Sequence, residues 1–202
     1  MKTPRKFSAF TLIELLVVIS IIAILASFAV PAVTGALAKG QMMQSVNNGR
    51  QIQQLTQINA LDATTTGDAT IIGWPGNISF TSWIGSLTNS ISTNDVARLF
   101  SAAGVIASWT GTSIDKSAFK VYQVSEASGG DTVFLTTANW TAPGSGGSGT
   151  ALVKSDLPYG DKGFVVVRKG GDAQPYLSKQ ATRADTFFGS TTNALTGIPA
   201  AQ

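Results

Sequence analysis

The sequence predicts an α+β protein in which one long N-terminal helix packs on a small antiparallel β-sheet head. The first half of that helix is predicted to span a membrane. One supporting observation is an apolar run near the N-terminus that continues into a polar segment with helical spacing. Another is a set of short segments with β-forming residues in the second half of the chain. With 202 residues, the chain can form one domain with an appended helix.

The apolar run from Leu15 to Val33 contains no charged side chain. A helix of this length measures about 28 Å, which is close to the thickness of a bilayer's hydrocarbon core. A basic cluster precedes the run, whereas only Lys39 and Arg50 follow it in the next stretch. The cluster consists of Lys2, Arg5 and Lys6. This asymmetry predicts a single-pass anchor with a cytoplasmic N-terminus and an exported head.

Glu14 lies at the start of the apolar run and should either have a cationic partner or reach the lipid headgroups. An isolated carboxylate inside a bilayer costs about 2.5–3.5 kcal/mol on insertion scales. No basic side chain follows Glu14 within a helical turn or two. We therefore expect its partner to come from elsewhere.

The block FTLIELLVVI at Phe10–Ile19, behind a short basic leader, resembles the cleavage and methylation signal of type IV pilins and type II secretion pseudopilins. The resemblance implies that a prepilin peptidase cuts between Ala9 and Phe10 and methylates the new Phe10 amine. In a filament, Glu14 would then pair with the Phe10 amine of a neighbouring subunit. Ala9 departs from the glycine that the family usually has before the cut. Pro31 matches a proline common in the family, and we expect a kink or local melting there.

The resemblance implies a structural filament subunit, a pseudopilin of a type II secretion system, anchored in the inner membrane with a periplasmic head. Its implied partners are other pilin-like subunits in a homo- or hetero-oligomeric filament, the prepilin peptidase and an inner-membrane assembly platform. A type IV pilus subunit for adhesion or motility is one alternative. Another is an exported periplasmic binding protein or enzyme, whose secretory signal would be cut after the pattern Ala36-Leu37-Ala38.

Composition argues against an enzyme and against a nucleic-acid-binding protein. The chain has neither cysteine nor histidine, so thiolate sites, His-based zinc centres and Ser-His-Asp triads are excluded. Three of the 14 basic residues lie in the leader, and the other 11 equal the 11 acidic residues. We therefore expect no nucleic-acid partner. We also expect no cofactor, although aspartates in glycine-rich loops offer the oxygen ligands that calcium prefers, namely Asp156, Asp161 and Asp172.

The sequence divides into four segments. These are a leader (1–9), a transmembrane and filament-core helix (10–33), an amphipathic continuation of that helix (34–61) and a globular head (62–202). Apolar residues recur every three positions in the amphipathic segment, which predicts one stripe that packs on the head. They are Ile52, Leu55, Ile58 and Leu61.

Local patterns in the head predict a turn-rich break at Asp62–Asp68 and a short helix over Ser92–Phe100, with an N-cap candidate at its start and Gly104 as the candidate for its end. Three segments read as strands, the first two as a hairpin. They are Phe119–Val124, Asp131–Thr137 and Gly163–Arg168. The tail Thr191–Gln202 lacks charge and periodicity, and we expect it to be loosely held.

Overall fold

The computed structural model describes residues 10–201, and these divide into two compact units, residues 10–39 and residues 40–201. Helix α1 runs from Leu12 to Thr66, past the expected end at Leu61. Three threonines extend it into the segment that was expected to break the helix. Their hydroxyls donate to carbonyls of the preceding turn, at 2.7–3.2 Å. These residues are Thr64, Thr65 and Thr66.

In the first unit, α1 is helical without interruption from Leu12 onward, and Pro31 lies inside it. Local melting at Pro31 is therefore not found, and the kink stays a prediction. The hydroxyls of this segment donate to carbonyls of the same helix, at 2.7–3.0 Å. Among residues 10–201, α1 is the one helix long and apolar enough to cross a membrane, judged by length and composition.

The second unit contains a four-stranded antiparallel sheet with the order β3-β4-β5-β6. Its strands are β3 (Phe119–Val121), β4 (Val133–Thr137), β5 (Gly163–Arg168) and β6 (Ala173–Leu177). The first three confirm the predicted strands, and β3 and β4 pair as expected. Strand β6 was not predicted, because Pro175 lies inside it and counts against a strand.

Smaller elements surround this sheet. They are α2 (Phe80–Leu87), α3 (Thr93–Leu99), the paired strands β1 (Trp109–Thr110) and β2 (Ser113–Ile114), and α4 (Asp185–Phe188). The predicted helix at Ser92–Phe100 is confirmed as α3. Ser92 is its N-cap and accepts the Asp95 N–H at 3.2 Å. The other four elements were not predicted from the sequence.

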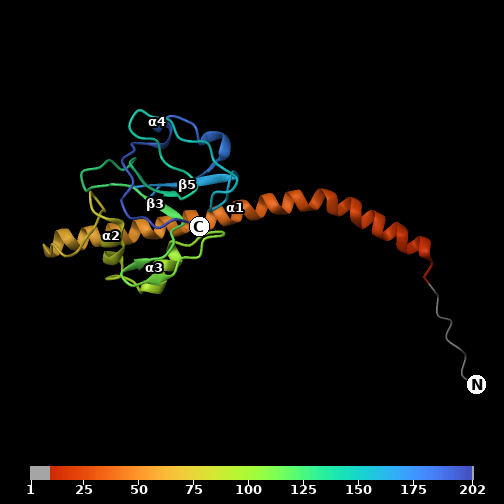
Figure 1. The fold of residues 1–202 in the computed structure, drawn as a ribbon, viewed down its shortest axis with the longest axis horizontal. Coiled ribbons are helices and arrows are strands. Elements are labelled where there is room, and N and C mark those ends of the chain that lie inside the picture. Colours follow the sequence, from red (N-terminus) through yellow and green to blue (C-terminus); the bar gives the residue numbers. More distant parts are fainter. Residues whose placement is uncertain (1–9, 202) are drawn as a thin grey trace, which may run out of the picture. The chain divides into compact units, whose positions relative to one another are not determined.

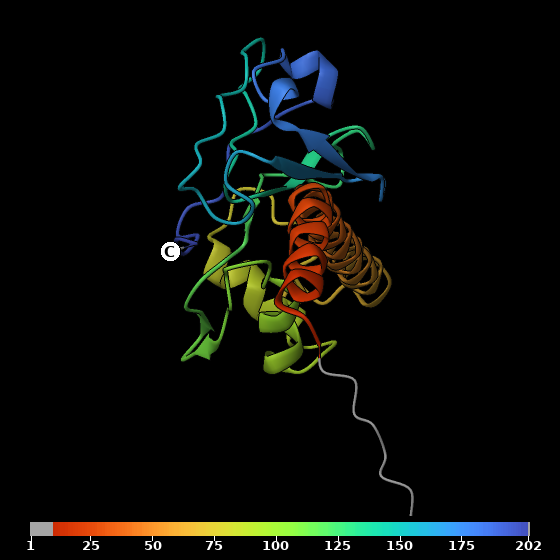
Figure 2. The ribbon, with the colours of Figure 1, turned by 90° about the vertical axis from the view of Figure 1, so that its right-hand side faces the viewer.

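From Gly40 onward, α1 packs between the sheet and α3. Figures 1 and 2 show the four-stranded sheet on one side of this part of α1 and α3 on the other. Gly49 lies against β5, where an added Cβ would come within 2.6 Å of Val167 Cγ2. A long helix packed on a small antiparallel sheet is the predicted α+β arrangement, which is thereby confirmed.

The face of α1 that packs on the head differs from the predicted apolar stripe. Ile52 is fully buried, but Ile58 and Leu61 are about half exposed. Residues spaced by three in a helix of 3.6 residues per turn step back by about 60°, so four of them spread around half the helix. The buried residues instead recur at alternating spacings of three and four along the helix. It comprises Met42, Ser45, Val46, Gly49, Ile52, Gln53, Thr56, Asn59 and Ala60.

About half of this buried face is polar, and its polar groups are paired. Gln53 Nε2 donates to the Lys169 carbonyl at 2.7 Å. Asn59 Nδ2 donates to the Ser86 carbonyl at 3.1 Å. Because buried polar groups are costly unless they are hydrogen-bonded, these contacts fix one rotational setting of α1 against the head.

Strand β5 is apolar on both faces because a core lies on each side of it. Val165 and Val167 face the core that includes α1, whereas Phe164 and Val166 face a second core. Trp140 stacks on Phe164 in the second core, with ring centroids 4.3 Å apart. This core comprises Tyr122, Val133, Trp140, Ala142, Phe164, Val166, Tyr176, Ala181 and Phe188.

The C-terminal segment is bound to the head rather than loosely held, contrary to expectation. Its backbone runs beside β3 and its continuation, where Leu195 N–H donates to the Val121 carbonyl and Gln123 N–H donates to the Asn193 carbonyl, both at 2.8 Å. Leu195 is also buried. The tail therefore covers one edge of the sheet, and β6 with its internal Pro175 forms the other edge.

We predict that Gly49→Ala destabilises the head, because overpacking of the contact with Val167 costs about 1–3 kcal/mol and outweighs the gain of about 0.5–1 kcal/mol from alanine in a helix. Gly40→Ala is the matched control in the same helix, since its Cβ would meet nothing within 4 Å. This control should stabilise the helix by about 0.5–1 kcal/mol. Denaturant unfolding followed by tryptophan fluorescence measures both changes. Equal effects of the two substitutions would contradict the claim that α1 and β5 lie close together because residue 49 has no side chain.

Candidate functional site

Thr11 and Glu14 cap the N-terminal turn of α1 with reciprocal hydrogen bonds. Thr11 N–H donates to Glu14 Oε2 at 2.9 Å, and Glu14 N–H donates to Thr11 Oγ1 at 3.3 Å. The Thr11 hydroxyl also donates to Glu14 Oε2, at 2.7 Å. This is a capping box, which satisfies N–H groups that the first turn of a helix leaves unpaired. The T-x-x-E spacing before an apolar run is the sequence signal for this role of Glu14, which was not predicted.

Only one carboxylate oxygen of Glu14 takes part in the capping box. Both hydrogen bonds to the carboxylate end on Oε2, and within residues 10–201 none ends on Oε1. No ion pair of Glu14 occurs in the same part of the chain. Glu14 can therefore cap its own helix and still accept a cation from outside.

The surface around Glu14 is apolar and uncovered. Phe10, Ile13, Val17 and Val18 lie around Glu14 on an open surface at the start of α1. Phe10 is 77% exposed, and none of the side chains in the most apolar part of α1 is buried. So large an exposed apolar surface marks a site of contact with lipid or with protein.

Of the predicted processing and assembly residues, Glu14 and Pro31 lie on α1, and Phe10 lies just before the helix. Phe10 and Glu14 lie close together at its start, whereas Pro31 lies well inside it. Ala9, the other residue at the predicted cleavage point, falls outside the described residues. The roles of Ala9, Phe10, Glu14 and Pro31 stay predictions.

The aspartates considered for calcium are not gathered into a site. Asp172 pairs with Arg168 next to the turn between β5 and β6. Asp156 and Asp161 lie in the loop that precedes β5. Over residues 10–201, no group of three or more acidic, histidine or cysteine side chains is arranged to hold a metal ion.

Comparison with known protein families finds the prokaryotic N-terminal methylation motif at residues 4–30. No curated protein and no solved structure matches the chain. The motif is the prepilin-type signal of type IV pilins and pseudopilins, so the signal predicted around Phe10–Ile19 is confirmed. It supports a pilin-like or pseudopilin subunit, a structural class rather than an enzyme class. Together with the apolar helix, it fits a protein anchored in the inner membrane.

We predict that Thr11→Val loosens the first turn of α1, because the valine has no oxygen to accept the Glu14 N–H. Loss of an N-cap costs about 1 kcal/mol, so the Glu14 amide should exchange its hydrogen about fivefold faster. Amide hydrogen exchange of the detergent-solubilised protein measures this. Thr11→Ser keeps the hydroxyl and should exchange like the wild type, and equal rates in all three proteins would refute the capping role.

Proposed function

We propose that the chain is a structural filament subunit, a pseudopilin of a type II secretion system. A prepilin peptidase would cut between Ala9 and Phe10 and methylate the Phe10 amine, and an inner-membrane assembly platform would then add the subunit to a filament. The observation that carries the proposal is the Glu14 carboxylate at the start of an apolar helix, with Oε1 available for a cation.

Cleavage would supply the missing counter-charge. The freed amine of Phe10 is a cation in the same apolar surroundings as Glu14. An attraction between unit charges in a low dielectric weakens rapidly as the charges separate, so the pair favours one axial position of the incoming subunit. The hydrogen bond from Thr11 lowers the free-energy cost of keeping the Glu14 carboxylate in apolar surroundings before the amine of a neighbouring subunit arrives.

The apolar surface of α1 supports the same assembly. In the membrane this surface contacts lipid, and in the filament it packs on the same surface of other subunits, so it stays covered throughout transfer. The basic residues before the helix favour a cytoplasmic N-terminus and a periplasmic head. The absence of cysteine supports secretion over an adhesive fibre, because adhesive pilins commonly carry a disulfide loop.

An ordinary secretory signal fits the helix poorly. Cleavage after Ala38 would cut α1 near its middle, since the helix runs without interruption from Leu12 to Thr66. The fragment after the cut would begin inside a helix. The prepilin signal instead places the cut before the helix begins.

We predict that the mature protein begins with N-methylated Phe10. Mass spectrometry of the N-terminal peptide from the native host measures this. A protein that begins at Lys39 would support the secretory alternative, and one that keeps its leader would refute processing altogether.

We predict that Glu14→Ala leaves cleavage largely intact but lowers the filament fraction at least about tenfold, because the Phe10 amine of the neighbour then lacks its partner. Glu126→Ala is the matched control, since Glu126 is the only other glutamate and is exposed in the head. Immunoblots of sheared filaments and of membranes separate assembly from processing. Normal filament yield in Glu14→Ala would overturn the proposed pairing.

A further inference from the structure

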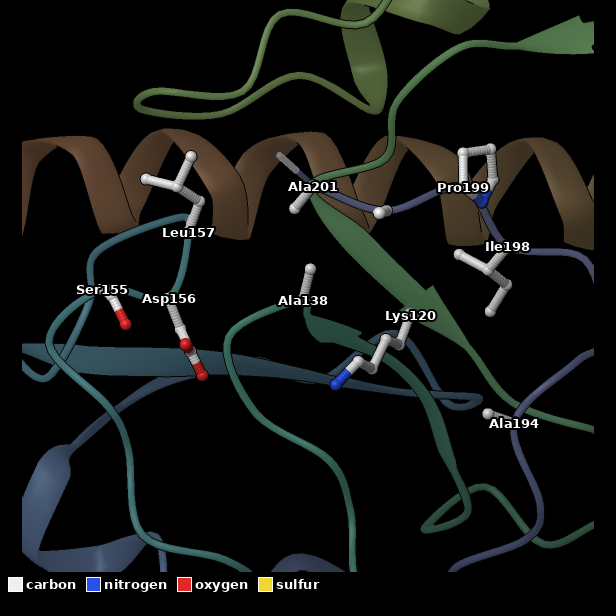
Figure 3. A pocket seen from close by; sticks show the side chains of 10 residues that line it. Lys120, Ala138, Ser155, Asp156, Leu157, Ala194, Ile198, Pro199 and Ala201 are labelled. Carbon is white, nitrogen blue, oxygen red and sulfur yellow. The ribbon is translucent and has the colours of Figure 1, made fainter.

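One side of the head contains a cavity of 870 Å³ that the filament function does not use. Three parts of the chain form it: the loop before β5, the C-terminal segment, and residues of β3 and the end of β4 (Figure 3). Most of its lining is apolar. The lining residues are Lys120, Ala138, Ser155, Asp156, Leu157, Ala194, Ile198, Pro199, Ala200 and Ala201.

The walls of the cavity are anchored to the head. Ala194 forms an isolated bridge with Tyr122, and Leu195 N–H bonds to the Val121 carbonyl. Thr196 accepts the N–H of Phe80, the first residue of α2, at 3.0 Å. The C-terminal wall is therefore held to both the sheet and α2.

Lys120 brings a poorly compensated positive charge to this cavity. Its Nζ donates to Thr141 Oγ1 at 2.6 Å, and an ammonium group has three donors, so two stay free for another acceptor. Within residues 10–201, no carboxylate oxygen lies within 4.0 Å of Lys120 Nζ. Burial lowers the pKa of Lys120, and the charge of Asp156 offsets this only in part.

The opposite wall has hydrogen-bond acceptors. Asp156 and Ser155 come from the loop before β5, and Figure 3 shows the side chains of Lys120 and Asp156 reaching into the cavity from opposite sides. Leu157 on the Asp156 side and Ile198 on the Lys120 side contribute apolar surface (Figure 3). The cavity thus offers a cation, an apolar wall and an acceptor of N–H groups.

We propose that this cavity binds the carboxyl-terminal end of a short apolar peptide segment. The terminal carboxylate accepts from Lys120, the last side chains contact Leu157 and Ile198, and a backbone N–H donates to Asp156. A simple organic acid would satisfy Lys120 and the apolar wall but would give Asp156 no donor, so the acceptor favours a peptide. The proposal does not depend on filament assembly, and its failure would leave that function untouched.

The test is calorimetric titration of the full chain in dodecyl maltoside micelles with three probes: acetyl-Ala-Ala-Leu with a free carboxylate, the same peptide as its carboxamide, and isovalerate. We expect the free-carboxylate peptide to bind at least about tenfold more tightly than the carboxamide, because a charge-assisted hydrogen bond is lost. Isovalerate should also bind at least about tenfold more weakly than this peptide. No binding of the peptide, or equal binding of the carboxamide, overturns the site. Equal binding of isovalerate overturns its assignment to peptides.

Variants locate the binding. Lys120→Met should weaken binding of the free-carboxylate peptide at least about tenfold, so that this peptide no longer binds more tightly than the carboxamide. Lys116→Met is the matched control, because Lys116 lies outside the cavity lining and should leave binding unchanged. Asp156→Asn alters an exposed loop residue, and it should weaken binding of the peptide but not binding of isovalerate. Unchanged peptide binding in both Lys120→Met and Asp156→Asn, with thermal unfolding like the wild type, overturns the proposal.

Discussion

The close contact between α1 and β5 at Gly49 determines how the head is built. At this position the helix has no side chain, and a methyl group of Val167 occupies the space that one would fill. One turn further along the helix, Gln53 binds the carbonyl of Lys169. Steric fit sets the distance between helix and sheet, and the hydrogen bond sets the rotation of the helix about its axis. An entirely apolar face would fix this rotation less strictly, because hydrophobic contact has no direction.

Local sequence patterns predict part of the fold, but they do not predict the rotational setting of α1. The long helix, α3 and three strands follow from local spacing and capping residues. The face of α1 that packs inward does not, because Gln53 and Asn59 are polar and resemble surface residues until their distant carbonyl partners are known. Likewise, β6 and the binding of the tail depend on pairing with strands far away in the sequence.

The two proposed sites also differ in whether the sequence alone could indicate them. The assembly site lies within five consecutive residues, Phe10–Glu14, so the sequence alone indicates its chemistry, including the capping box once the spacing is noticed. The cavity around Lys120 combines segments that are far apart along the chain and several alanines with no distinctive pattern. Its acidic residue, Asp156, appeared in the sequence only as a calcium candidate. Tertiary structure is needed to place it opposite a lysine.

The two edges of the sheet have a consequence for crowded copies of this protein. An open strand edge offers unpaired N–H and C=O groups to any similar edge nearby, and this promotes uncontrolled fusion of sheets. Here the C-terminal segment covers the β3 side, and on the other side β6 has a proline, which has no N–H to donate. Many heads can therefore lie side by side at high local concentration without fusing through their sheets.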